Sequence, residues 1–156
     1  MTTAELTEPA RNASSQVQLR GRFLIMDDEQ DIREITAGAI REIGGDADCV
    51  ADGATALRLY REAKEQGRPY ELVILDLTIR GGMGGKETNE LLHEIDPTVK
   101  TIVMSGYSND LIMADCRKYG FSAMIAKPFA IAGFTRAVYD LLNAPVGAKR
   151  ESDLPA

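Results

Sequence analysis

Five short apolar runs divide the middle of this 156-residue chain at regular intervals, and the segments between them keep a helical period. Several runs are nearly continuous in apolar residues, which is typical of strands that are covered on both faces. Strict alternation of strand and helix predicts a parallel sheet with right-handed crossovers and helices on both sides. We therefore expect an α/β fold built on a doubly wound, five-stranded parallel sheet. Its predicted strands span residues 22–26, 47–51, 71–75, 100–104 and 122–126.

The predicted helices each carry one apolar stripe, and most end at a glycine or just before a proline. In the fourth helix the stripe consists of Ile112, Cys116 and Tyr119, and Gly120 ends it. The stripes of the five helices begin at Ile32, Ala56, Leu91, Ile112 and Ile131.

Composition limits the class of protein. A net charge of −6 argues against a nucleic-acid surface, and no apolar run approaches membrane-spanning length. Cys49 and Cys116 lie far apart, which favours reduced thiols in a cytoplasmic protein. Residues 1–20 and 144–156 are polar and lack apolar periodicity, so we expect two flexible tails around one domain, 21–143. The second tail is too short for a DNA-binding module.

A glycine-rich stretch between residues 81 and 85 resembles a phosphate-binding P-loop at first sight. The P-loop pattern requires a glycine five places before Gly85 and a hydroxyl directly after Lys86. Arg80 and Glu87 stand at these two positions. The glycines therefore predict a flexible turn that leads into a helix, and a P-loop is excluded.

Polar residues follow four of the predicted strands directly: Asp27 and Asp28, then Asp76, Ser105 and Lys127. Each one alone fits an ordinary helix cap, turn or surface charge. In a doubly wound sheet, however, the carboxyl ends of the strands form the binding edge. We therefore expect these five side chains to converge there.

Three clustered carboxylates repel each other strongly. Two unit charges ~4 Å apart at an effective dielectric near 20 interact by about 4 kcal/mol. One ammonium group offsets only part of this repulsion, whereas a hard divalent ion with oxygen ligands offsets more. The pattern therefore predicts a site for Mg²⁺, or for Mn²⁺ in its place.

Four segments now match a family in order and at compatible spacing: "FLIMDDE", "LVILDLT", "IVMSGY" and "IAKPF". With them, residues 21–143 resemble a response regulator receiver domain, which has a flavodoxin-like, CheY-like (βα)5 fold. The resemblance implies that Asp76 accepts a phosphoryl group from a phosphohistidine. It also implies that Lys127 pairs with one phosphoryl oxygen and that Ser105 hydrogen-bonds another.

The same resemblance implies a metal-ligand set. Asp28 and Asp76 would bind Mg²⁺ directly, Asp27 would act through water, and the main-chain carbonyl of Thr78 would complete the protein ligands.

The sequence departs from the family in the loop after the acceptor and in the switch residues. Receivers often have proline four places after the acceptor, where this chain has Arg80, and its glycine-rich loop resembles that of receivers in hybrid histidine kinases. Many receivers carry an aromatic residue three places before the lysine, where this chain has Met124. We therefore expect Ser105 and Tyr107, rather than Met124, to report the switch. His93, on the third helix, is expected to be solvated.

The implied partner is a histidine kinase or a histidine phosphotransfer protein, and a homodimer is compatible with the sequence. Neither a nucleic acid nor a membrane is expected as a partner. The implied role is that of a phosphoacceptor rather than an enzyme acting on other molecules. Two alternatives stay open: a receiver-like binding module that is never phosphorylated, and a phosphohydrolase with an aspartyl nucleophile. The second is disfavoured because Asp76-Leu77-Thr78 lacks the second aspartate of a D-x-D motif.

Overall fold

The computed structural model describes residues 20–106 and 111–143 of the chain. The expected tails therefore lie almost wholly outside the described residues, and so does Tyr107. Within the described ranges, no helix is both long enough and apolar enough to cross a bilayer.

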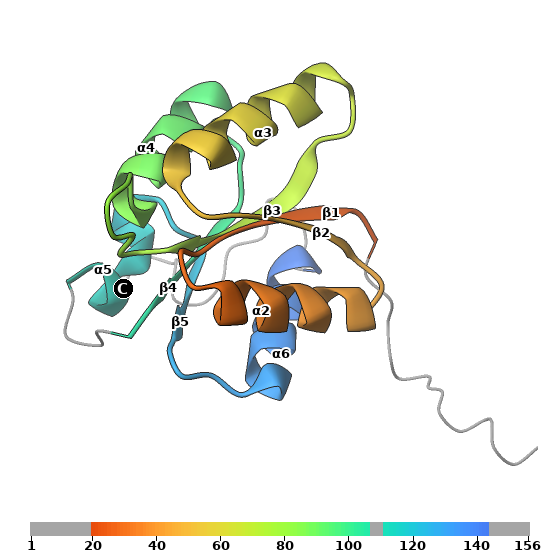
Figure 1. Cartoon of the computed structure of the whole chain (residues 1–156), viewed down its shortest axis with the longest axis vertical. Coiled ribbons are helices and arrows are strands. Elements are labelled where there is room, and N and C mark those ends of the chain that lie inside the picture. Colours follow the sequence, from red (N-terminus) through yellow and green to blue (C-terminus); the bar gives the residue numbers. More distant parts are fainter. Residues whose placement is uncertain (1–19, 107–110, 144–156) are drawn as a thin grey trace, which may run out of the picture.

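One five-stranded sheet forms the centre of the molecule, with helices above and below it (Figure 1). All neighbouring strands are parallel, and their order is β2-β1-β3-β4-β5. The doubly wound parallel sheet predicted from the alternation is confirmed. The strands are β1 (Arg22–Met26), β2 (Asp46–Val50), β3 (Tyr70–Asp76), β4 (Thr101–Ser105) and β5 (Ala123–Ala126).

In the described residues, four α-helices and one 3-10 helix connect the strands, and a fifth α-helix follows β5. They are α2 (Gln30–Glu42), α3 (Gly53–Glu65), α4 (Gly85–Ile95), α5 (Leu111–Ala114), η1 (Cys116–Tyr119) and α6 (Ile131–Leu142). Where one long fourth helix is predicted, the structure has the single turn α5 followed by η1. Asp115, with φ −146° and ψ 68°, is not helical and separates the two. Gly120 ends this segment in the left-handed conformation, as its position predicts.

The sheet separates two apolar layers, because alternate residues of each strand face opposite sides. Phe23 and Ile25 of β1 pack with α2 and α6, whereas Leu24 and Met26 pack with α3, α4 and α5. These four side chains are fully buried. Burial on both faces explains why the strand reads as a continuous apolar run.

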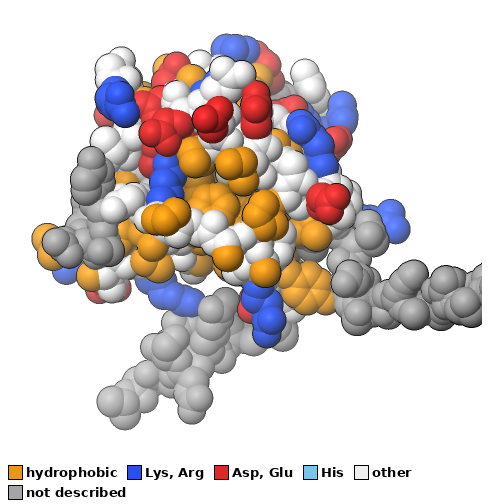
Figure 2. All heavy atoms as spheres, turned by 60° about the horizontal axis from the view of Figure 1, so that its bottom comes forward, with side chains coloured by type: hydrophobic (Ala, Val, Ile, Leu, Met, Phe, Trp, Pro, Cys, Tyr) orange, Lys and Arg blue, Asp and Glu red, His pale blue; other side chains and the backbone are white. Residues whose placement is uncertain are grey.

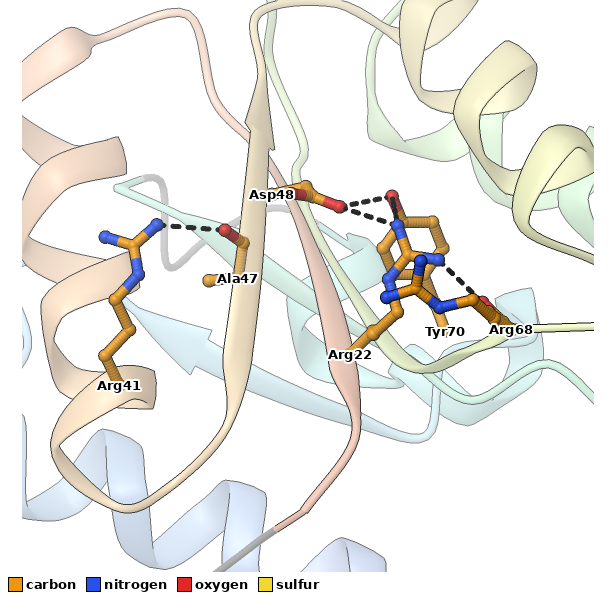
Figure 3. A network of polar contacts seen from close by, with 6 residues as sticks. All are labelled: Arg22, Arg41, Ala47, Asp48, Arg68 and Tyr70. Carbon is orange, nitrogen blue, oxygen red and sulfur yellow. Dashed lines mark hydrogen bonds and ion pairs between the residues drawn. The ribbon is translucent and has the colours of Figure 1, made fainter. Parts of the chain in front are cut away.

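A polar network joins three strands at the amino-terminal end of the sheet (Figure 3). Arg22 on β1 contacts Asp48 on β2 at 3.0 Å, and Tyr70 on β3 donates a hydrogen bond to the same carboxylate at 2.7 Å. The Arg22 guanidinium also lies 4.5 Å from the centre of the Tyr70 ring. Arg41 donates to the carbonyl of Ala47 on the edge strand at 2.9 Å. These contacts support the register of β1, β2 and β3, and that register determines which residues end each strand at the opposite edge.

The glycine-rich loop packs its backbone closely against the end of β3. Gly81 adopts a left-handed conformation with φ +73°. A Cβ on Gly84 would lie 2.7 Å from the Leu77 carbonyl oxygen, and one on Gly85 would lie 2.6 Å from the Asp76 carbonyl oxygen. The predicted turn into a helix is therefore confirmed, and glycine is required where the loop meets the strand.

Apolar side chains also gather on one outer face, which Figure 2 shows by bringing the bottom of Figure 1 forward. The exposed large apolar residues include Ile35 on α2 and Ile131 on α6.

Candidate functional site

The carboxyl ends of four strands meet at one edge and carry the predicted polar residues. Asp27 directly follows β1, and Lys127 directly follows β5. Asp76 is the last residue of β3 and Ser105 the last of β4. Each of these four strands therefore brings one functional group to the edge of the sheet.

Three carboxylates form a compact cluster at this edge. One oxygen from each of Asp27, Asp28 and Asp76 lies within 4.8 Å of the others. Asp27 and Asp76 are buried, whereas Asp28 is half-buried. Neither Asp27 nor Asp28 is the N-cap of α2, because that position is Glu29. The Asp27 carboxylate instead accepts a hydrogen bond from the Glu29 main-chain nitrogen at 2.9 Å.

Lys127 provides the positive charge next to this cluster. Its Nζ lies 2.8 Å from Asp27 Oδ2 and 3.4 Å from Asp76 Oδ1. Its main-chain nitrogen donates to the Ser105 carbonyl at 2.9 Å, which joins the end of β5 to the end of β4. Lys127 is therefore held at the site by both its backbone and its side chain.

The surroundings of Asp76 disfavour its ionised form. Burial, followed by the nearby charge of Asp27, raises the pKa of Asp76 from 3.8 to about 6, although Lys127 acts in the opposite direction. Burial acts to lower the pKa of Lys127, but its hydrogen bond to Asp27 and the charge of Asp76 raise it. At neutral pH the site therefore holds an ionised Asp76 at an energetic cost, beside a firmly charged Lys127.

A cavity of about 320 Å³ opens beside Asp76. Its lining includes Thr78 and Ser105, as the sequence motifs predict, and also three residues that those motifs do not assign to the site. These three are Glu29, Arg80 and Gly106. Arg80 is tied to the acidic cluster because its main-chain nitrogen donates to Asp28 Oδ2 at 3.0 Å. The only feature of the sequence that pointed to Arg80 as a residue of this cavity is its position four residues after Asp76.

Two other predicted residues lie outside this cavity. Met124 is on the edge strand β5 and is 38% exposed. His93 is half-buried on α4, and its ring nitrogen lies 2.9 Å from the Gly120 carbonyl oxygen, near the amino end of β5. His93 thus lies on the predicted helix and away from the acidic edge, partly exposed and in contact with the backbone of Gly120.

The donor set fits a hard divalent cation. Carboxylate oxygens are the ligands that Mg²⁺ prefers, together with water and phosphate oxygens. Three carboxylates within 4.8 Å of each other, with one ammonium beside them, leave the cluster negatively charged. The arrangement is suited to binding a cation and a phosphoryl group together, because the cation and Lys127 can both offset the added negative charge.

The fold and the carboxylate cluster define an α/β domain with an acidic site at the carboxyl ends of its strands. Comparison with known proteins identifies the family. The sequence model of the response regulator receiver domain matches residues 23–139. The chain belongs to this family, as its motifs indicate, and it contains the receiver domain of two-component signal transduction.

Relatives and solved structures agree with this assignment. An NtrX-like response regulator of Rickettsia bellii is 32% identical over 107 residues, covering 68% of this chain and 21% of that protein. The CheY-like receiver domain protein of Methanospirillum hungatei is 25% identical, with a TM-score of 0.68 over 80% of this chain and 95% of that one. TrrA of Thermotoga maritima, solved with Mg²⁺-BeF, is 27% identical, with a TM-score of 0.65 over 78% of this chain and 98% of that one.

The chain corresponds to only part of its curated relatives. It spans less than half of the length of those that it matches, between 21% and 44%.

Proposed function

We propose that Asp76 is the phosphoacceptor of this receiver domain and that it takes a phosphoryl group from a phosphohistidine. The donor would be a histidine kinase or a histidine phosphotransfer protein. The observation that carries this proposal is the Asp76 carboxylate at the end of β3, 3.4 Å from Lys127 Nζ and lining a cavity of about 320 Å³.

The transfer is a nucleophilic substitution at phosphorus. A carboxylate oxygen of Asp76 forms a bond to phosphorus while the bond from phosphorus to the histidine nitrogen breaks. The bonding electron pair leaves with that nitrogen, so the donor recovers its imidazole. Asp76 must be ionised for this attack, and a pKa of about 6 leaves it mostly ionised at neutral pH. Lys127 pairs with a phosphoryl oxygen as negative charge accumulates there.

The metal ligands belong to the same proposal. Asp27, Asp28 and Asp76, with the main-chain carbonyl of Thr78, would hold Mg²⁺ or Mn²⁺. The ion would supply charge stabilisation for the phosphoryl oxygens. The clustered carboxylates of this chain support this assignment, and so does the Mg²⁺-BeF complex of TrrA from Thermotoga maritima.

The signal would leave the site through Ser105. Its side chain is buried at the end of β4 and lines the cavity, from which it can hydrogen-bond a phosphoryl oxygen. The expected reporter Tyr107 lies outside the described residues, whereas Met124 is exposed on β5. Met124 is flexible enough to adjust to movement of the neighbouring strand.

The proposed domain covers residues 21–143, and the family match lies inside it. Both cysteines are free thiols, which suits the reducing cytoplasm where we propose that the transfer occurs. Use as a binding module alone is disfavoured because it would leave the clustered carboxylates and Lys127 without a role.

The proposal is tested by intact-mass measurement after incubation with acetyl phosphate. The wild-type protein should gain one phosphoryl group when Mg²⁺ is present and none in EDTA. Asp76→Asn should gain none, whereas the matched variant Asp96→Asn, on a carboxylate at the end of α4, should be labelled like the wild type. Equal labelling of Asp76→Asn would refute the assignment of the acceptor.

A further inference from the structure

Arg80 is a second cation at the proposed phosphorylation site, in addition to Lys127. It is exposed, and it lines the cavity beside Asp76 together with Lys127. No ion pair joins Arg80 to another residue in the part of the chain that the structure describes. Its charge is therefore available to a ligand of the cavity.

The backbone holds Arg80 at a defined place. Ile79, the preceding residue, is buried in the core, and the Arg80 main-chain nitrogen donates to Asp28 Oδ2 at 3.0 Å. The flexible glycines begin only after Arg80, with Gly81 in the left-handed conformation. The backbone of Arg80 is thus fixed both by the buried Ile79 and by the hydrogen bond to Asp28.

Arg80 and Asp76 also line the same cavity. An oxygen of Asp28 and one of Asp76 lie within 4.8 Å of each other, and Arg80 is hydrogen-bonded to Asp28. The stem of an arginine side chain is long and flexible, so the Arg80 guanidinium can turn toward a group on Asp76 within the cavity that both residues line.

The charge balance of the cavity calls for a second cation after phosphorylation. Lys127 already contacts both Asp27 and Asp76. A phosphoryl group adds roughly one further negative charge and new acceptor oxygens. Arginine is well suited to these oxygens because its planar guanidinium can donate two parallel hydrogen bonds to phosphate.

We propose that Arg80 is a phosphate-pairing residue whose guanidinium contacts the phosphoryl group on Asp76 and stabilises the modified state. This inference rests on the proposed function, because it takes Asp76 as the acceptor. It assigns to the loop after β3 a direct part in holding the phosphoryl group.

Beryllofluoride, a mimic of the phosphoryl group, provides the test when its affinity is measured by calorimetry on the full chain with saturating Mg²⁺. Arg80→Met should weaken beryllofluoride binding by about threefold to tenfold, since an exposed charge pair contributes less than a buried one. Arg80→Lys should recover part of the loss, because an ammonium pairs with phosphate at one point only. Arg58→Met, at an exposed arginine of α3, is the matched control and should bind like the wild type.

If Arg80 had a purely structural role, Arg80→Met would lower Mg²⁺ affinity together with beryllofluoride affinity. Under the proposed role, Mg²⁺ affinity without beryllofluoride should be unchanged or slightly higher, because the main-chain hydrogen bond to Asp28 survives in Arg80→Met. Parallel loss of Mg²⁺ affinity, or beryllofluoride binding equal to that of the wild type, would overturn the inference and leave the proposed function intact. Failure of the wild-type protein to bind beryllofluoride at all would instead overturn both.

Discussion

Replacing the proposed acceptor by its uncharged isostere should make the protein more stable, because Asp76 is ionised at an energetic cost. Burial and the charge of Asp27 raise its pKa from 3.8 to about 6. Each tenfold change in proton affinity corresponds to about 1.4 kcal/mol. The ionised Asp76 therefore destabilises the native state by up to about 3 kcal/mol above pH 6. Asp76→Asn should gain this free energy of unfolding at pH 7.5 in EDTA.

The pH dependence follows from the direction of the pKa shift. Between about pH 4 and pH 6 the native state retains a proton on Asp76 that the unfolded state has lost. Stability contributed by this group therefore falls as the pH rises through that window. The difference between Asp76→Asn and the wild type should be largest above pH 6 and should disappear near pH 4. If Mg²⁺ binds as proposed, it should also reduce the difference, because the ion would stabilise the wild-type carboxylate cluster.

Urea unfolding at several pH values measures this effect, and the midpoint of Asp76→Asn should lie ~1–2 M above that of the wild type at pH 7.5. Asp96→Asn is the matched control with the opposite sign. Although partial burial acts to raise it, hydrogen bonds from Thr98 and Tyr60 lower the pKa of Asp96. Asp96→Asn should therefore be less stable than the wild type at neutral pH, and the difference should shrink as the pH falls below about 4. Equal stability of Asp76→Asn and the wild type at pH 7.5 would refute the reasoning.

Two further predictions concern Lys127 and the glycines. Lys127→Ala should retain or increase Mg²⁺ affinity, because it removes a cation that lies 2.8 Å from Asp27. The same variant should lose most of the chemical-shift response to beryllofluoride in NMR spectra. A large loss of Mg²⁺ affinity would contradict this role of Lys127. Gly85→Ala should lower the free energy of unfolding by roughly 1–3 kcal/mol, because its Cβ would lie 2.6 Å from the Asp76 carbonyl oxygen. Gly133→Ala, where a Cβ meets nothing within 4 Å, should be neutral or stabilising in the same chemical denaturation measurement.

The strands were predictable because burial on both faces leaves a direct mark on the sequence. β1 has the predicted bounds, Arg22–Met26. At their carboxyl ends, β3 and β4 each continue one residue beyond the predicted bounds, to Asp76 and Ser105, because a hydrophobic pattern assigns polar residues at strand ends to loops. The convergence of the acidic edge followed from the topology alone, since parallel strands bring their carboxyl ends together.

The break in the fourth helix could not be predicted from its apolar stripe. Ile112 is buried, and Cys116 and Tyr119 pack against the same core, so the spacing correctly identified the inward face. This spacing is equally compatible with a short α-turn followed by a 3-10 turn, and a break at Asp115 leaves it unchanged.

Contacts between residues far apart in the chain could not be predicted from the sequence either. The hydrogen bond between Arg80 and Asp28 joins residues 52 positions apart, and that between His93 and Gly120 joins residues 27 positions apart. Both depend on the relative placement of loops, and hydrophobic periodicity carries no information about this placement.

The brevity of α5 sets the energetic scale on which this domain can respond. One turn of helix, Leu111–Ala114, and a following 3-10 turn contain few main-chain hydrogen bonds, such as that from the Asp115 nitrogen to the Leu111 carbonyl at 3.1 Å. Local opening of such a segment requires far less free energy than global unfolding. A coupling of about 1–3 kcal/mol between two sites is therefore sufficient to redistribute the populations of this segment while the sheet keeps its arrangement. We therefore expect α5 and η1, the two four-residue helices of the described residues, to change conformation more readily than the long helices.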